Sequence, residues 1–185
     1  MPASRSAFFS RALARRLLPL FFLALAACTP KMDWRDFYAE DGGFIVLFPK
    51  KPGQAEHPLA TPMGKVTMKM YSTRIDETAL GAGFADFPQA VDAHALDVMR
   101  DALVKSMGGT LTSEKPITSA GQNGIPGREI VITATLGQGG KSAPGEMRAR
   151  LFARDKRYYQ ILLVSHKGTF DANDADMFLT SFKPA

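Results

Sequence analysis

Apolar and polar residues alternate along much of the chain after residue 33, the period of a half-buried β-strand. Val66, Met68 and Met70, for example, alternate with polar side chains within residues 65–74. Similar patterns predict further strands at 34–39, 44–48, 78–87, 111–118, 128–136, 146–154 and 157–166. Turn residues at 40–43, 61–64 and 155–156 predict tight hairpins between neighbouring strands, and residues 137–144 are expected to form a loop.

The period changes to that of a helix in one central segment, residues 92–107. Asp92 is placed to cap its start, and Gly108-Gly109 to end it. A short amphipathic helix is expected at about 173–182, burying Phe178, Leu179 and Phe182. Hairpin-linked strands with few alternating strand–helix units predict the α+β class. We expect a single domain, a mainly antiparallel sheet flanked by these two helices.

The first residues have the pattern of a secretory signal peptide. Residues 1–16 carry four arginines and no acidic residue, and residues 17–27 are uninterrupted apolar sequence ending at Cys28. That apolar run has 11 residues, whereas a helix that spans a bilayer needs about 20. A cleaved export signal is therefore favoured over a permanent transmembrane helix.

Leu25-Ala26-Ala27-Cys28 resembles the lipobox of bacterial lipoproteins. The resemblance implies cleavage before Cys28, diacylglycerol on its thiol and acylation of the new amine. Cys28 is the only cysteine, so no internal disulfide can form. In such lipoproteins an Asp directly after the cysteine tends to retain the protein in the inner membrane. Residue 29 is Thr, so the resemblance implies a location on the periplasmic face of the outer membrane. The expected division is signal peptide 1–27, lipidated cysteine and short tether 28–33, and folded domain 34–185.

The formal net charge of +5 belongs mainly to the signal peptide. Without residues 1–27, 19 basic residues face 18 acidic ones. Bulk charge therefore gives no support for nucleic-acid binding.

Several strings in the domain resemble small bacterial lipoproteins with a PsbP/Mog1-like domain, across most of residues 34–183. They are Phe44-Ile45-Val46-Leu47-Phe48-Pro49, Gly124-Ile125-Pro126-Gly127-Arg128-Glu129, Arg148-Ala149-Arg150-Leu151-Phe152, Arg157-Tyr158-Tyr159-Gln160-Ile161 and Phe178-Leu179-Thr180-Ser181-Phe182. The resemblance implies an antiparallel sheet with flanking helices and a non-catalytic role in protein binding or assembly. It carries over no catalytic residue.

The patterns typical of catalytic and metal sites are missing or incomplete. Residues 137–142 resemble a phosphate-binding loop, but Thr135 stands where its first glycine belongs and Pro144-Gly145 would break the helix that must follow. His57, His94 and His166 lack the spacing of a helical metal site. No Gly-x-Ser-x-Gly motif occurs. The acidic run of Asp171, Asp174 and Asp176 lacks the glycine and glutamate of a calcium loop and is expected to cap the last helix. No metal, cofactor or catalytic residue is expected.

One row of cations has the geometry of a binding surface. Arg148, Arg150 and Arg154 lie at even spacing along one expected strand and so share a face, and Arg128 and Arg157 are expected nearby. Such a row could meet an anionic ligand. The alternative is a solvated face with Glu129 and Glu146 as counterions.

These observations predict a membrane-anchored envelope lipoprotein with a non-catalytic binding or adaptor domain and an envelope protein as partner. Two alternatives remain open: an envelope hydrolase with residues scattered over the fold, and an anionic-ligand module that uses the arginine row.

Overall fold

β-Strands make up most of the part of the chain that the computed structural model describes, residues 32–122, 124–138 and 141–185. The predictions on the signal peptide, its cleavage and the lipidation of Cys28 lie outside these residues. Asp33–Ala185 is one compact unit. No helix within the described ranges is long and apolar enough to cross a membrane.

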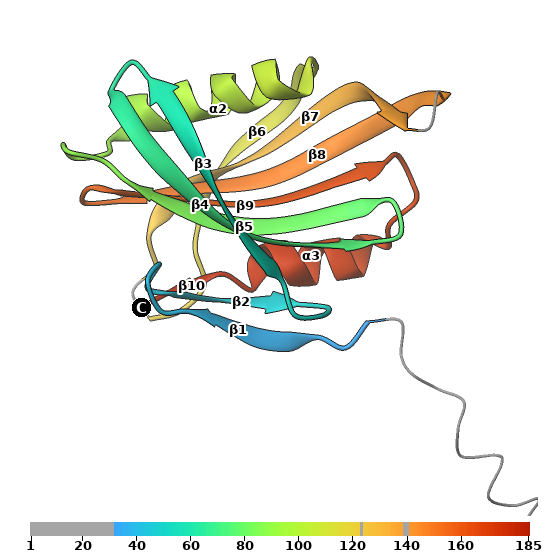
Figure 1. Cartoon of the computed structure of the whole chain (residues 1–185), viewed down its shortest axis with the longest axis horizontal. Coiled ribbons are helices and arrows are strands. Elements are labelled where there is room, and N and C mark those ends of the chain that lie inside the picture. The colour runs from blue at the N-terminus through green and yellow to red at the C-terminus, as the bar shows by residue number, and fades with distance from the viewer. Residues whose placement is uncertain (1–31, 123, 139–140) are drawn as a thin grey trace, which may run out of the picture. The chain divides into compact units, whose positions relative to one another are not determined.

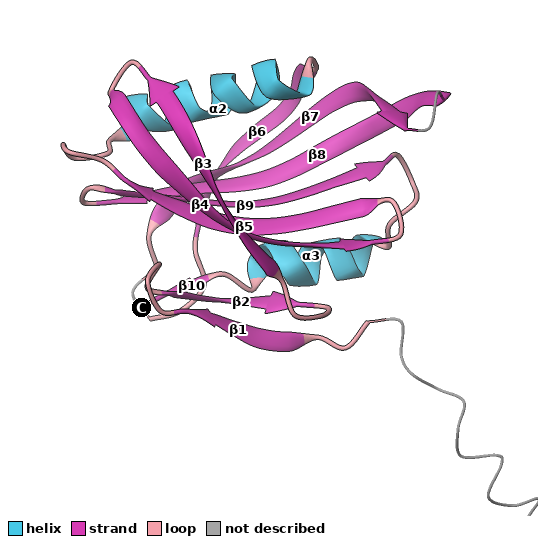
Figure 2. Ribbon diagram, in the orientation of Figure 1, coloured by secondary structure: helices cyan, strands magenta, loops and turns pink. Residues whose placement is uncertain are grey.

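A large antiparallel sheet of seven strands forms the centre of this unit, in the order β3-β4-β5-β9-β8-β7-β6 (Figures 1 and 2). Its strands are β3 Gly53–Thr61, β4 Gly64–Ile75, β5 Thr78–Asp86, β6 Thr110–Thr118, β7 Pro126–Gln138, β8 Lys141–Arg154 and β9 Arg157–His166. A small sheet of order β1-β2-β10 joins Arg35–Ala39, Phe44–Phe48 and Lys183–Pro184. The mainly antiparallel α+β architecture confirms the predicted class.

Helix α2, Ala93–Met107, packs against β7 and β8 on one face of the large sheet. Asp92 accepts a hydrogen bond from the Ala95 backbone N–H at its start. Gly108 ends it with a φ of 58°, a left-handed conformation that glycine adopts without steric cost. Both caps were expected from the sequence.

Helix α3, Ala172–Thr180, lies on the opposite face, between β9 and the small sheet (Figure 1). The side chain of Asp171 caps it by accepting from two backbone N–H groups, those of Asn173 and Asp174. It ends two residues before the predicted end, because the hydroxyl of Ser181 donates to the Phe178 carbonyl and also accepts from the Leu47 N–H of β2. The chain therefore leaves the helix after Thr180 and enters β10 at Lys183.

Successive residues of the strands point to opposite faces, so the large sheet contributes to two separate cores. On the α2 side, buried residues of the helix pack on β7, β8 and β4. The other face carries an aromatic core, formed by Phe37, Phe44, Phe48, Tyr71, Phe84, Phe152, Tyr159, Phe178 and Phe182. This aromatic core holds the small sheet and α3 against the large sheet.

The loop predicted for residues 137–144 is shorter than expected. β7 extends through Gln138 and β8 begins at Lys141, and Pro144 pairs with Thr135 within the ladder. Pro144 is tolerated there because β9 pairs with β8 only from Gly145 onward, so this end of β8 is an edge strand. A second difference is β10, which is too short to give a period in the sequence.

Candidate functional site

The arginine row lies where its alternation predicts, on the face of β8 that carries α3. Each arginine has a specific partner there. Arg148 Nη2 lies 2.6 Å from Asp176 Oδ1 of α3, and Arg154 Nη2 donates to the Ala185 carbonyl at 2.8 Å. Arg150 lies 2.6 Å from Glu129 Oε2 on the neighbouring strand β7. The row therefore belongs to a network that joins β8 to β7, to α3 and to the C-terminus.

Glu129 is the most buried member of this network, with 6% of its side chain exposed. Lys115 binds its other carboxylate oxygen at 2.8 Å. Burial raises the pKa of the Glu129 carboxyl, but the hydrogen bonds and charges of Lys115 and Arg150 outweigh burial and hold that pKa below its ordinary value. Glu129 is thus the predicted counterion of the row.

The other residues assigned to the row behave differently. Glu146 has no ion pair with a described side chain; it lines a cavity of about 120 Å³ that Arg148 also lines. Arg128 bonds to Asp97 of α2 and therefore lies on the opposite face of the sheet. Arg157 lies directly opposite Arg154 in the β8–β9 register, as expected, and binds Asp86 on β5 through two nitrogens. Anion binding by Arg148, Arg150 and Arg154 stays a prediction.

The three histidines considered for a metal site lie on different elements. His57 is exposed on β3, His94 is the second residue of α2, and His166 ends β9 with its Nε2 3.9 Å from Glu77. Ser119 accepts from the Ile125 N–H and so closes the loop before β7. Within the described ranges, no three His, Cys, Asp or Glu side chains gather closely enough to hold a metal ion.

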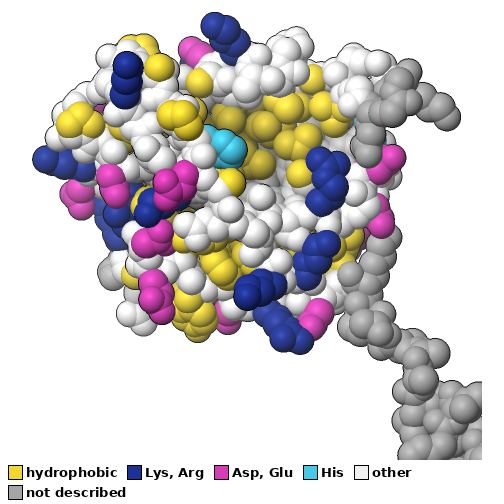
Figure 3. Space-filling model, in the orientation of Figure 1, with side chains coloured by type: hydrophobic (Ala, Val, Ile, Leu, Met, Phe, Trp, Pro, Cys, Tyr) yellow, Lys and Arg dark blue, Asp and Glu magenta, His cyan; other side chains and the backbone are white. Residues whose placement is uncertain are grey.

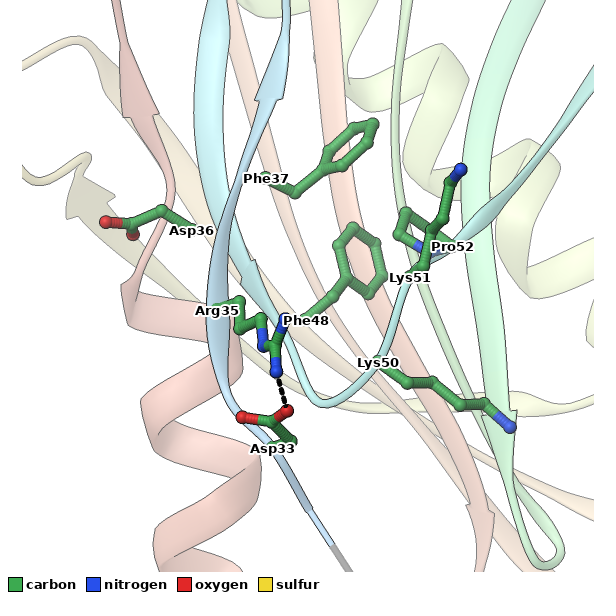
Figure 4. A pocket seen from close by; sticks show the side chains of 8 residues that line it. All are labelled: Asp33, Arg35, Asp36, Phe37, Phe48, Lys50, Lys51 and Pro52. Atoms are coloured by element: carbon green, nitrogen blue, oxygen red, sulfur yellow. Dashed lines mark hydrogen bonds and ion pairs between the residues drawn. The ribbon is translucent and has the colours of Figure 1, made fainter.

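A groove of about 390 Å³ opens at the start of the domain, between β1 and the segment that follows β2. The rings of Phe37 and Phe48 lie at its centre (Figure 4), 5.7 Å apart in an edge-on arrangement. Its full lining is Asp33, Arg35, Asp36, Phe37, Phe48, Lys50, Lys51 and Pro52. Both aromatic residues belong to the aromatic core, so the groove has a firm apolar floor.

The rim of this groove is cationic. Lys50 and Lys51 extend from the segment after β2 (Figure 4), and Asp36 of β1 also lines the groove. Arg35 pairs with Asp33. Both lysines are exposed, and neither forms an ion pair with a described side chain. The groove thus combines an apolar floor with a lining that has one positive charge in excess.

The sequence contained a signal for this groove that alternation alone does not use. Pro49-Lys50-Lys51-Pro52 stands between two strands and predicts only a break in the chain. Pro52 disfavours helical backbone at Lys51, the residue before it, so two adjacent lysines are expected in a turn or extended segment at the surface. Recognising a site there requires the fold, because Phe37 and Phe48 come from two paired strands.

A second surface lies on the α2 side of the large sheet. Figure 3 shows a hollow lined with hydrophobic side chains below α2. The partly exposed hydrophobic residues that border the α2-side core include Met63, Met70, Leu103, Met107, Leu162 and Val164. Three are methionines, whose flexible side chains adapt to varied partners.

Met70 lies across the neighbouring strand in this hollow. A Cβ placed on Gly83 of β5 would lie 2.2 Å from Met70 Sδ, so only glycine leaves room for this side chain. Gln160 Nε2 lies 3.3 Å from the same sulfur. A Cβ on Gly81 of β5 would lie 3.0 Å from Met70 Cε and 3.4 Å from Leu162 Cδ1, so the side chains of β4 and β9 approach each other above β5.

No protein-family model matches the chain, and no curated protein sequence matches it. Solved structures do match in fold. The solution structure of cyanobacterial PsbP (CyanoP) from Synechocystis sp. PCC 6803 has a TM-score of 0.52 and 13% sequence identity, and the alignment covers 88% of this chain and 99% of that one. A crystal structure from Bacteroides thetaiotaomicron has a TM-score of 0.48 and 10% identity, covering 83% of this chain and 49% of that one. The similarity to CyanoP extends over almost the whole of that protein, so this domain has a PsbP-like fold.

Proposed function

We propose that this chain is a cell-envelope lipoprotein, anchored through lipid on Cys28, whose PsbP-like domain binds a partner protein and catalyses no reaction. The observation that carries the anchor is Leu25-Ala26-Ala27-Cys28 at the end of a basic and then apolar leader. Two or three acyl chains stabilise membrane attachment by about 0.8 kcal/mol per buried methylene, far more than one myristoyl chain. Thr29 favours the periplasmic face of the outer membrane.

The short tether supports a role at the membrane surface. Five residues join Cys28 to Asp33, where the compact unit begins. Fully extended, they span about 18 Å. A domain held this closely can meet other membrane proteins but cannot sample the depth of the envelope.

The hollow on the α2 side supports binding. Partly exposed apolar surface that is rich in methionine is typical of protein-binding faces. Leu162 and Met70 occupy neighbouring positions on it, where an acidic side chain would oppose an apolar contact without entering the buried core.

Crosslinking in intact membranes followed by pull-down tests this function. The wild-type chain should capture a protein that Cys28→Ala does not, because the variant cannot take the lipid. Leu162→Glu should lose that capture while remaining membrane-bound, whereas the exposed control Thr67→Glu on β4 should keep it. Equal capture by Leu162→Glu and wild type would remove the hollow as the binding face.

A further inference from the structure

The groove between β1 and the segment after β2 adjoins the tether. Asp33, which lines it, is the first residue of the compact unit and follows Cys28 by five positions. The headgroup layer adds only about 5–7 Å to each side of the hydrocarbon core. Even with the tether fully extended, the groove wall lies no more than about 12 Å from the headgroups, about one and a half times the Debye length of about 8 Å at physiological salt, and a bent tether brings it within that length.

The charges near the anchor have one sign in excess. Lys50 and Lys51 have no ion pair among the described side chains, while Arg35 and Asp33 neutralise each other. Asp36 also lines the groove, so three cations of the lining, Arg35, Lys50 and Lys51, stand against two carboxylates. In the sequence, Lys31 adds a further cation to the tether, and residues 28–32 contain no acid. The surface beside the tether is therefore complementary to an anionic membrane.

The shape of the groove fits part of a lipid. Its volume of about 390 Å³ falls in the range of small-molecule sites, roughly 300–1,000 Å³. Two lysines can bind a phosphate at the rim, and the rings of Phe37 and Phe48 offer an apolar floor to the glycerol and the first methylenes below it. A protein partner would need no such pairing of a dilysine with a ring-lined floor.

We propose that this groove binds the headgroup of an anionic phospholipid in the membrane that carries the lipid anchor. The inference rests on the proposed anchoring through Cys28, which holds the groove at the membrane. Docking fixes one orientation of the domain, with the small sheet toward the bilayer and α2 on the far side of the large sheet (Figure 1). The hollow below α2 then stays open to the envelope.

Trp34 provides a built-in reporter. It is the only tryptophan of the chain and stands between two groove residues, Asp33 and Arg35. The mature lipidated protein is reconstituted in vesicles of phosphatidylcholine, or of phosphatidylcholine with about one third phosphatidylglycerol. A trace lipid with a spin label on its headgroup quenches Trp34 fluorescence when the groove docks.

Phosphatidylglycerol should increase the quenching of Trp34 in the wild type. Each basic residue near an anionic surface raises the equilibrium constant for docking by about fivefold. Lys50→Gln combined with Lys51→Gln should therefore lower that constant by about 25-fold and abolish the increase in quenching that phosphatidylglycerol causes. The matched control combines Lys65→Gln on β4 with Lys105→Gln on α2; both lysines are exposed and neither lines the groove. It should respond like the wild type.

The possible failures can be told apart. Protein that does not float with either vesicle contradicts the anchor itself. Protein that floats, but whose quenching ignores phosphatidylglycerol, overturns the groove inference alone. An equal increase in quenching for the wild type and the variant with both groove lysines replaced also overturns the groove inference. That result is expected if the tether or a second copy of the chain fills the groove. A change in Trp34 fluorescence on adding soluble glycerol phosphate that is as large as the change with phosphatidylglycerol would show that the ligand need not come from the membrane.

Discussion

The substitution Glu129→Gln tests whether the arginine row stabilises the fold through its ion pairs. The substitution keeps the shape of the side chain and removes the charge that Arg150 and Lys115 share. A hydrogen bond to a charged group contributes about 1.5–3 kcal/mol and a neutral one about 0.5–1.5 kcal/mol. The Arg150 pair should therefore lose about 1.5 kcal/mol. Lys115, with 59% of its side chain exposed, should lose less than about 1 kcal/mol.

Together these losses lower the free energy of unfolding by about 2 kcal/mol at neutral pH, or about 4–8 °C in Tm for a domain of this size. Thermal unfolding followed by circular dichroism measures the shift. The matched control is Glu146→Gln on the same face, which has no ion pair with a described side chain and should change stability by less than about 0.5 kcal/mol.

The effect of Glu129 also depends on pH. Because the folded-state pKa of Glu129 lies below its ordinary value of 4.5, its stabilisation is fully present above pH 4.5. It is lost as the pH falls through the lowered folded-state pKa. The difference between wild type and Glu129→Gln should therefore shrink in acid. Equal losses from Glu129→Gln and Glu146→Gln, or a difference that ignores pH, would refute the network.

Two further predictions concern the aromatic core and its edge. Phe182→Ala should lower the free energy of unfolding by about 3–5 kcal/mol in chemical denaturation, because Phe182 is 2% exposed and its ring stacks on Phe152 with centroids 5.0 Å apart. The control is Tyr38→Ala, at a site 64% exposed. A loss for Phe182→Ala no larger than that of the control would contradict this packing. Burial and the hydrogen bond to Asp41 raise the pKa of Tyr71 to about 12, so Asp41→Asn should lower that pKa in an ultraviolet titration of the phenolate. An unchanged pKa would remove Asp41 as a cause.

The parts of the fold that follow from short-range patterns could be predicted from the sequence. Alternation located β4, and Asp92 and Gly108 bounded α2, because strand period and helix caps are properties of neighbouring residues. The end of α3 could not be predicted, since the bond that Ser181 makes to Leu47 joins residues 134 positions apart. The division into two sheets depends on contacts of the same long-range kind.

The candidate site divides in the same way. Alternation placed Arg148, Arg150 and Arg154 on one face of the strand. The ion pair between Arg148 and Asp176, however, depends on how α3 packs against the sheet. The groove escaped prediction because its floor joins Phe37 to Phe48, and neither residue is distinctive alone. Charge and period locate surfaces in a sequence, whereas a concave site needs the register of paired strands.

The central claim is that lipid on Cys28 holds a binding domain at the membrane, and intact mass analysis of the mature protein from native membranes tests it most directly. The account predicts a chain that begins at Cys28 and carries a diacylglyceryl group, with an acyl chain on its amine. A mass that retains residues 1–27, or one that leaves the thiol unmodified, would contradict it.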